Sequence, residues 1–340
     1  MLCLPEGSVQ SQRMLLRTCR RALLLLAFPL ASLAQQAPAA DSAPTFRVAG
    51  SELSSHTKVI AYGDQRFHDP SNVLVANPKA RVWLVQKIAE EKPDAIQMSG
   101  DVPYRGTNPA DYQQYATETK PWRDKNLRVY PALGNHEISG GVQKGVENWW
   151  AAFPELNGMR WYSVALGDRI TLINLDSTLE LTPGSRQIRW LRAQLTGLSP
   201  SVDFVIISLH HPPIADIQTV EHVDHNPRPN EIALRDFIAQ IDPTLHAAIV
   251  VVAGHIHNYE RFDYKGVTYL VSGGGGAQPY PVTRGKDDLY QDPGFPNFHF
   301  VEFELKKDKL KATMYRLADA TDIKKTKWQK KDHFEIEKKK

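Results

Sequence analysis

Short apolar runs alternate with amphipathic segments along most of the chain, and the apolar runs predict buried strands. Each of five such runs is followed by a polar turn. The segments between them repeat apolar residues at helical spacing, which predicts helices that lie against a sheet. The predicted strands are 58–62, 94–99, 127–133, 204–209 and 245–253, and the predicted helices are 78–92, 108–119, 187–198 and 231–241. This alternation favours an α/β fold.

Other apolar runs predict antiparallel pairing. Residues 161–166 and 169–175 flank a Gly-Asp turn, which favours a hairpin. A last group of strands, also expected to be antiparallel, is predicted at 267–271, 298–304 and 311–315.

The first 34 residues predict a signal peptide. Arginines precede the apolar run 22–31, and Ser-Leu-Ala at 32–34 suits cleavage. The run is shorter than the roughly 18 residues of a membrane-spanning helix, and no later stretch is long enough. A buried first helix is the alternative. We therefore expect export to the periplasm or the exterior, with residues 35–44 as a linker, 45–320 as the folded domain and 321–340 as a solvated Lys-rich tail.

Composition removes several classes of protein. Hydrophobic residues make up 42% and charged residues 23% of the 340 positions, which is ordinary for a globular chain. Both cysteines, Cys3 and Cys19, lie in the predicted signal peptide, so thiolate metal sites, disulfides and cysteine nucleophiles are excluded from the remainder. The net charge is +3, but its positive excess lies at the two ends and leaves about −5 between them. Nucleic-acid recognition needs a basic face and is not expected.

Metal-competent side chains follow the five buried strands. In open α/β sheets, ligands bind outside the carboxyl ends of the strands, so these side chains should surround one crevice. A glycine precedes most of them and allows a sharp turn with a ligand close to the backbone. The residues are Asp64, Asp101, Asn135, His210 and the pair His255 and His257.

This donor set is suited to hard or borderline metal ions. Carboxylate, amide oxygen and imidazole bind such ions, whereas soft ions prefer sulfur. Asp101 lies in the middle of the series and could bridge two ions with its two oxygens. Two metals about 3.5–4 Å apart clamp the attacking and leaving oxygens of a phosphoryl displacement. The pattern therefore predicts a two-metal site.

The motifs GDQRF, GDVPY, GNHE, LHHPP and GHIHNYER resemble the signature of the calcineurin-like metallophosphoesterases, and in particular the branch of the purple acid phosphatases. The resemblance runs from about residue 45 to 318. It implies an α/β fold in which two mixed β-sheets pack face to face in a four-layer α/β/β/α sandwich. The segment 35–57 before the first motif is too short for the β-sandwich domain, of about 100 residues, that precedes this domain in plant members. We therefore expect the single-domain, secreted bacterial-type form.

The resemblance also implies roles for single residues. A ferric ion would be held at the first site, and a divalent iron, zinc or manganese ion at the second, with a hydroxide held by the metals as nucleophile. His136 would face the substrate phosphate and assist the leaving group. The first metal would be bound by Asp64, Asp101, Tyr104 and His257, and the second by Asp101, Asn135, His210 and His255.

Tyr104 and Arg66 bear on the identity of the first metal. A phenol has a pKa of about 10, so only a strongly acidic cation keeps it as phenolate. A Tyr ligand therefore indicates a trivalent ion, and a Tyr that packs nearby without binding is the alternative. Arg66 departs from the family pattern of Asp-x-His or Asp-x-Gly. It cannot bind a metal, and either points away or binds the substrate phosphate.

Four histidines have open roles. His210 matches the ligand position of its motif, and alternation along a strand would send His211 to the opposite face. His68 is expected to be a loop residue rather than a replacement ligand. His225, in the loop 221–230, is a candidate substrate contact, with a solvated loop as the alternative.

The leading hypothesis is a binuclear-metal phosphoesterase that hydrolyses small phosphate monoesters. A phosphodiesterase with the same metal site is the first alternative. A non-catalytic metal- or phosphate-binding envelope protein is the second, although the GNHE motif argues against it. No Gly-x-Ser-x-Gly occurs, which disfavours a serine hydrolase. The sequence does not indicate the oligomeric state.

Overall fold

A computed structural model of the chain describes residues 42–216, 219–220, 223–292, 294–318 and 327–340, all within a unit that begins at Gln35. The predicted signal peptide and most of the predicted linker lie outside the described residues. Among the described residues, no helix has both the length and the apolar character needed to cross a membrane.

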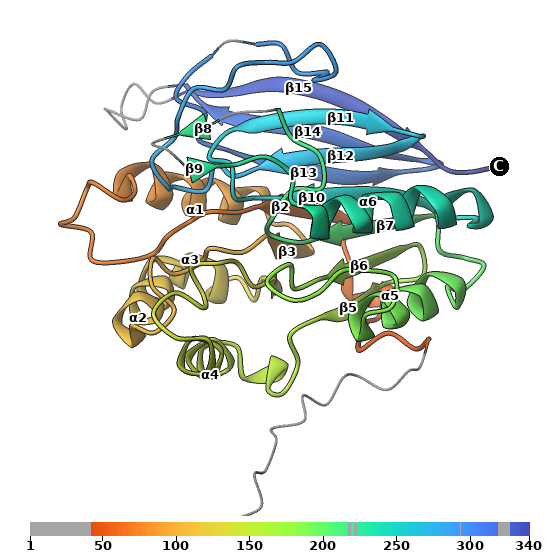
Figure 1. The fold of residues 1–340 in the computed structure, drawn as a ribbon, viewed down its shortest axis with the longest axis horizontal. Helices are drawn as coiled ribbons and strands as arrows, with labels where there is room; N and C mark the ends of the chain where they lie inside the picture. Colours follow the sequence, from red (N-terminus) through yellow and green to blue (C-terminus); the bar gives the residue numbers. More distant parts are fainter. Residues whose placement is uncertain (1–41, 217–218, 221–222, 293, 319–326) are drawn as a thin grey trace, which may run out of the picture. The chain divides into compact units, whose positions relative to one another are not determined.

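Two mixed sheets form the centre of the fold (Figure 1). The first has the strand order β1 (Phe46–Val48), β5 (Tyr162–Leu166), β6 (Ile170–Asn174), β7 (Phe204–Ser208), β10 (Ala248–Ala253), β12 (Val267–Ser272) and β11 (Tyr259–Tyr264). The second has the order β15 (Trp328–Glu337), β14 (Lys309–Leu317), β13 (His299–Lys306), β2 (Lys58–Tyr62), β3 (Ala95–Met98) and β4 (Val129–Pro131). The short strands β8 (Thr219–Val220) and β9 (Val223–Asp224) pair separately.

Alternating side chains bury both faces of the first sheet. Along β7, Ile206 packs into the cluster shared with the second sheet, whereas Val205 and Ile207 pack into a second apolar cluster. That second cluster holds the apolar faces of α5 (Arg186–Thr196) and α6 (Pro229–Ile241). Burial on both faces explains why these strands are continuous apolar runs in the sequence.

The second sheet is covered by the remaining helices. Gln97 on β3 faces the first sheet, because its Nε2 donates to the carbonyl oxygens of Ile173 and Ile206 at 3.1 and 3.3 Å. On the opposite face, the Tyr62 ring meets the Trp122 ring edge to face at 6.5 Å. Figure 1 shows the corresponding grouping of helices. The helices that cover the second sheet are α1 (Pro78–Glu91), α2 (Pro109–Glu118), α3 (Lys120–Arg123) and α4 (Val142–Ala152). Short 3₁₀ turns lie at Gly50–Glu52, at Pro154–Leu156 and, directly after α6, at Asp242–Thr244. The predicted α/β/β/α sandwich is therefore confirmed.

Local sequence signals explain where several helices begin. The side chains of Asn77, Asn108 and Ser185 accept hydrogen bonds from the first turns of α1, α2 and α5. Pro follows directly in α1 and α2, at a position where its missing N–H costs nothing. These caps lie within one residue of the predicted helix boundaries or two residues outside them.

The prediction of a solvated tail is wrong for residues 328–337, which form β15 and pair with β14. Lys309 lies 2.6 Å from Glu335 and 2.9 Å from Glu337 across this pair. At the sheet edge, Asp332 accepts from the Tyr259 hydroxyl at 2.9 Å and from Arg261 Nε at 2.7 Å. Alternating charges on an edge strand resemble a loop in the sequence, although they protect such an edge from unwanted pairing.

Candidate metal centre

The carboxyl ends of strands from both sheets meet at the candidate site. Strands β2, β3 and β4 run parallel in the second sheet, and β7 and β10 run parallel in the first. The backbone turns sharply there, because Asp64, Asp101 and His255 have φ values of 64°, 56° and 72°. Non-glycine residues rarely adopt this left-handed region, and such conformations cluster at functional sites.

Glycines allow the carboxylates to approach the backbone. Only Gly100, among those that precede candidate ligands, has a positive φ, of 90°. A Cβ on Gly134 would lie 2.3 Å from Asp101 Oδ1, and one on Gly254 would lie 2.5 Å from Asp64 Oδ2. Gly134 and Gly254 therefore leave room for a carboxylate beside the backbone. After Gly63 and Gly254, the positive φ lies at the next residue, Asp64 or His255.

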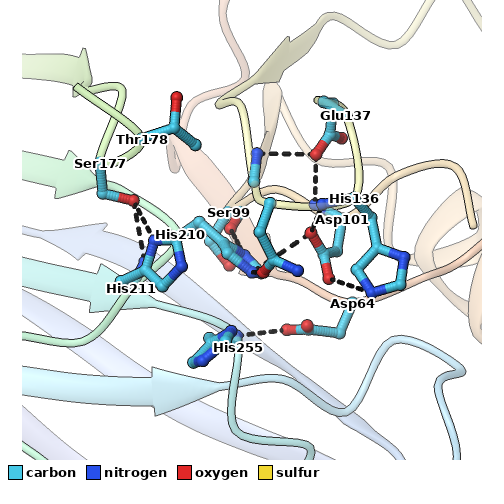
Figure 2. A network of polar contacts seen from close by, with 12 residues as sticks. Asp64, Ser99, Asp101, His136, Glu137, Ser177, Thr178, His210, His211 and His255 are labelled. Carbon is cyan, nitrogen blue, oxygen red and sulfur yellow. Dashed lines mark hydrogen bonds and ion pairs between the residues drawn. The ribbon is translucent and has the colours of Figure 1, made fainter. Parts of the chain in front are cut away.

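Asp101 lies at the centre of the polar network (Figure 2). Its Oδ1 accepts the backbone N–H of His136 at 2.9 Å and lies 3.2 Å from His210 Nε2. Its Oδ2 lies 3.4 Å from Arg66 Nη2 and 3.7 Å from His136 Nε2. The two oxygens therefore face different sets of partners, as a bridging carboxylate would.

Asp64 is only partly satisfied by the protein. Its Oδ2 accepts the backbone N–H of His255 at 2.8 Å. Its Oδ1 is buried without a hydrogen bond among the described residues and lies 3.6 Å from His257 Nε2. His257 Nε2 and His255 Nδ1 are also buried and have no hydrogen-bond partner in the part of the chain that the structure describes. Unpaired polar atoms in a protein interior are costly unless a ligand completes them.

Backbone carbonyls fix the tautomers of two candidate ligands. His210 Nδ1 lies 2.9 Å from the Ser99 carbonyl, and His257 Nδ1 lies 2.8 Å from the Gln278 carbonyl. A carbonyl oxygen only accepts, so each Nδ1 carries a proton and donates it. In the neutral ring, the lone pair then lies on Nε2, where a metal could bind.

Acceptor atoms converge at His210. Its Nε2 lies 2.9 Å from Asn135 Oδ1 and 3.2 Å from Asp101 Oδ1. Burial lowers the pKa of His210, which favours the neutral ring with a lone pair on Nε2. When the lone pair lies on Nε2, it faces two acceptor oxygens, and a cation bound between them would remove the resulting repulsion.

The two carboxylates have opposite pKa shifts. Burial raises the pKa of Asp64 well above its usual value, and the charge of Asp101 adds to this rise. The pKa of Asp101 lies below its usual range, although burial opposes its ionisation. The nearby His136 and His210, together with Arg66, favour its charged form. Burial also lowers the pKa values of His255 and His257, which keeps both imidazoles in the form that binds metal.

Glu137 is an important residue to which the sequence analysis gave no role. Its buried carboxylate accepts the backbone N–H groups of Asp101, Val102 and Gly134 at 3.0, 2.8 and 2.7 Å. Burial and the charge of Asp101 raise its pKa to about 8. Glu137 holds two of the ligand-bearing turns together. The only signal for it in the sequence was the fourth letter of GNHE.

The residues present fit a pair of metal ions. The site contains two groups of potential ligand atoms, and within each group the atoms lie within 4.8 Å of one another. One group is made by Asp64, Asp101 and His210, and the other by His210, His211 and His255. The donors are carboxylate oxygen, amide oxygen and imidazole nitrogen, which bind hard or borderline cations. Together with the unpaired buried atoms of Asp64, His255 and His257, this composition supports the predicted two-metal site.

Tyr104 lies beside the carboxylates, and its ligand role stays a prediction. Its ring packs between His68 and His136, with centroid distances of 5.8 and 5.6 Å. Its backbone carbonyl accepts from His136 Nδ1 at 2.5 Å. His68 is a loop residue, since its two ring nitrogens each lie 2.6 Å from a backbone carbonyl, of Arg66 and Asn72. No ring nitrogen of His68 is left for a metal.

Arg66 and His225 both lie at the site. Arg66 Nη2 approaches Asp101 Oδ2, and Arg66 Nε is buried without a hydrogen bond among the described residues. The side chain therefore does not point away from the site. The His225 ring lies 5.3 Å from the His255 ring and 5.4 Å from the Tyr280 ring. The substrate-binding roles of both residues stay predictions.

The expectation that His210 and His211 face opposite sides is wrong. Strand β7 ends at Ser208, so both residues lie beyond the strand and its alternation does not apply to them. Their ring centroids are 4.9 Å apart, and the His211 ring also lies 4.5 Å from the His255 ring. The structure therefore brings a further imidazole to the site.

Comparison with known proteins agrees with this geometry. The model of the calcineurin-like phosphoesterase family matches residues 67–259. Over 257 residues the chain is 21% identical to a protein of Arabidopsis thaliana described as a probable inactive purple acid phosphatase 9. The aligned region covers 63% of this chain and 38% of the relative. Over 190 residues it is 26% identical to a probable cyclic nucleotide phosphodiesterase of Rhodococcus erythropolis, which covers 53% and 57%.

The fold is also similar to that of a purple acid phosphatase from seeds of yellow lupin, Lupinus luteus. The TM-score is 0.65 at 17% identity, over 85% of this chain and 55% of that one. At this identity the likeness concerns the fold alone. In each of these matches the aligned region spans less than two thirds of the other protein.

Proposed function

The chain belongs to the calcineurin-like phosphoesterase family, and from this premise we propose that it hydrolyses phosphate monoesters at a two-metal centre. The observation that carries the proposal is the convergence of three metal-competent groups at the strand ends, where His210 Nε2 lies 2.9 Å from Asn135 Oδ1 and 3.2 Å from Asp101 Oδ1. Imidazole, amide oxygen and carboxylate at these distances suit a bound hard or borderline cation. Bound metals would polarise the phosphoryl group and activate water.

Each metal would take ligands from both sheets. Asp64, Asp101, Tyr104 and His257 would bind ferric iron, and Asp101, Asn135, His210 and His255 a divalent iron, zinc or manganese ion. The unpaired Oδ1 of Asp64 and Nε2 of His257 support the first set. Tyr104 is the residue that favours iron, because a phenolate needs a strongly acidic cation.

His136 is proposed to donate a proton to the leaving group. Its Nδ1 is held by the Tyr104 carbonyl at 2.5 Å, which orients the ring. Its Nε2 lies 3.7 Å from Asp101 Oδ2, and the His136 side chain is partly exposed. Because Nδ1 donates to the carbonyl, Nε2 can act as an acid only when the ring is doubly protonated, and the carbonyl then holds its N–H in a fixed direction for proton transfer.

Arg66 is the residue that favours monoesters over diesters. Its guanidinium has one long contact, at 3.4 Å, with Asp101 Oδ2, and its buried Nε lacks an acceptor among the described residues. The Arg66 guanidinium and His136 Nε2 both approach Asp101 Oδ2. A phosphate bound beside His136 would therefore also contact Arg66. A fixed positive charge favours the dianion of a monoester over the monoanion of a diester.

Phosphodiester hydrolysis is the alternative, and the relatives support it. The Rhodococcus erythropolis relative is described as a probable cyclic nucleotide phosphodiesterase. The same metal ligands and His136 would serve both reactions. A non-catalytic binding protein is a third candidate, because the Arabidopsis thaliana relative is described as a probable inactive purple acid phosphatase.

Turnover of 4-nitrophenyl phosphate and of bis(4-nitrophenyl) phosphate by the metal-loaded protein tests the proposal. We expect kcat/KM to favour the monoester at least about tenfold. Arg66→Gln should lower the monoester value roughly 10- to 100-fold, the equivalent of one charged hydrogen bond, and change the diester value less. Arg105→Gln removes an exposed guanidinium nearby and serves as control. Preference for the diester would refute the monoesterase, and turnover of neither substrate with both metals bound would refute the enzyme.

We also propose that the protein acts in the periplasm or outside the cell. The support is the arginine-flanked apolar run at 22–31 and the small residues at 32–34. Fractionation of expressing cells and N-terminal sequencing of the product would test this. Full-length protein in the cytoplasm would contradict it.

A further inference from the structure

His211 is a buried imidazole at the site to which the proposed function gives no role. It is 4% exposed, and one of its ring nitrogens lies within 4.8 Å of ring nitrogens of both His210 and His255. It could be a metal ligand or a hydrogen-bond donor. These roles require opposite tautomers, because a ligand nitrogen needs a lone pair and a donor nitrogen needs a proton.

Ser177 decides between these tautomers. Its Oγ accepts the backbone N–H of His211 at 3.0 Å and lies 2.8 Å from His211 Nδ1 (Figure 2). In the described part of the chain, the hydroxyl makes no other hydrogen bond, so its own proton has Nδ1 as its only acceptor. The opposite tautomer would leave a buried hydroxyl proton without an acceptor, which is costly.

It follows that the proton of the His211 ring lies on Nε2. A neutral ring that accepts from Ser177 carries it there, and a doubly protonated ring carries one there as well. His210 and His257 differ, since each Nδ1 donates to a backbone carbonyl and leaves the lone pair on Nε2. His210 and His257 therefore present lone pairs at Nε2, whereas His211 presents an N–H.

The position of Ser177 is itself fixed by the surrounding structure. Its carbonyl accepts from Arg228 Nη2 at 2.8 Å, and Arg228 Nε lies 2.8 Å from Glu231 Oε2 at the start of α6. On the other side, the preceding Asp176 is held by Arg160 Nε at 2.6 Å. Ser177 is 1% exposed. The backbone of Ser177 is thus held between the ion pair at the start of α6 and the buried pair of Arg160 with Asp176.

We propose that His211 donates its Nε2 proton to a phosphoryl oxygen of the bound substrate, and that Ser177 is the positioning residue that fixes this tautomer. The proposal rests on the proposed function. His211 lies among the imidazoles proposed for the second metal, whereas His136 and Arg66 approach from the Asp101 side. A phosphate at the centre would then receive donors from two opposite sides of the site.

Metal content and binding of inorganic phosphate test the role of His211 without relying on turnover. His211→Ala should keep two metals per chain and weaken phosphate binding about 3- to 10-fold in calorimetry, the effect of one neutral hydrogen bond. His211→Gln, which retains an N–H donor, should recover part of that affinity. His210→Ala should instead lose metal. Loss of a metal from His211→Ala would make His211 a ligand and overturn the proposal, as would unchanged phosphate affinity.

The tautomer itself can be measured. Nitrogen NMR of zinc-loaded protein labelled in histidine should show His211, assigned by comparison with His211→Gln, as the Nε2–H tautomer. Ser177→Ala should shift it towards Nδ1–H and lower phosphate affinity towards that of His211→Ala, whereas Ser177→Thr, which keeps the hydroxyl, should restore both. Ser163→Ala removes another buried serine hydroxyl, bonded to Gln194 at 2.6 Å, and should change neither. An Nδ1–H tautomer in the unmodified protein would overturn the proposal.

The outcomes for His211 and for the enzyme are separable. If the protein binds phosphate through His211 but hydrolyses neither test substrate, the inference holds and the proposed function fails. If it hydrolyses monoesters with His211→Ala unchanged in phosphate affinity, the function holds and the inference fails.

Discussion

Two buried aspartates at strand ends differ in what completes them. Asp176 follows β6, and its carboxylate accepts from Arg160 Nε at 2.6 Å and from the N–H and hydroxyl of Thr178 at 2.9 and 2.6 Å. Asp64 follows β2, and among the described residues its carboxylate accepts one hydrogen bond, from the backbone N–H of His255 at 2.8 Å. Both side chains are 0% exposed.

The difference separates structural from functional burial of charge. Burial raises the pKa of both groups, but for Asp176 the Arg160 guanidinium opposes the rise, whereas for Asp64 the charge of Asp101 adds to it. Asp176 is complete within the protein and holds its loop in place. Asp64 Oδ1 is buried and accepts no hydrogen bond from the described residues. Its environment therefore fits a bound cation.

The largest effect is expected where the incomplete carboxylates meet. Asp101→Asn removes the charge that faces His210, Arg66 and His136, so metal and activity should be lost together. We expect activity to fall at least about 10³-fold, since several kcal/mol of transition-state stabilisation depend on bound metals. Elemental analysis and steady-state kinetics measure both. Two metals per chain with near-normal turnover would end the bridging role of Asp101.

A large loss of activity without loss of metal is expected at His136. His136→Ala should keep both metals and reduce turnover roughly 10²- to 10⁴-fold, the usual contribution of a general acid. The deficit should shrink for substrates with good leaving groups, because these need less protonation. If metal disappears with activity, His136 is a ligand and the assignment is wrong.

The complete carboxylate should respond in stability instead. Asp176→Ala leaves Arg160 buried without its partner, and we expect a loss of about 3–5 kcal/mol in the free energy of unfolding. Chemical denaturation measures this loss, and metal content under native conditions should stay at two per chain. An unchanged stability would show that Asp176 is not the structural counterpart of Asp64.

Removal of metal should destabilise the protein in its turn. A ligand that binds only the folded state adds about 2.7 kcal/mol at a concentration 100 times its Kd. A chelator should therefore lower the Tm of the metal-loaded protein, and it should lower that of Asp176→Ala by a similar amount. The chelator should have no effect on Asp101→Asn, and an equal shift in that variant would indicate metal bound elsewhere.

The smallest structural effect is expected at Tyr104. If its phenolate binds ferric iron, the oxidised protein should absorb in the visible range, and Tyr104→Phe should abolish the band while Tm changes little. The reason is that only a hydroxyl is removed, from a residue that is partly exposed. A colourless, active protein that contains only divalent metals would refute the ferric assignment and leave the two-metal site standing.

Most of the fold could be predicted because each buried strand is a continuous apolar run that can be recognised from its own residues. Ile206 and its neighbours form an uninterrupted apolar run, and Asn77 and Asn108 mark where helices begin. The strands β11 and β15 were missed, because Glu260, Arg261 and Asp332 make them resemble loops. Arg261 and Asp332, 71 positions apart, pair at 2.7 Å only when the two sheet edges meet.

The sequence by itself determined the α/β class, the order of the strands along the chain and the residues at their carboxyl ends, since local hydrophobicity and glycine placement record these. Only the tertiary structure decided which ring nitrogens carry protons, that Arg66 faces Asp101, that His211 joins His210 and His255, and that Glu137 ties two turns together. Hydrogen bonds between segments that are distant in the sequence fix these features. Ser177 and His211 are 34 positions apart, and no local pattern in the sequence records their contact.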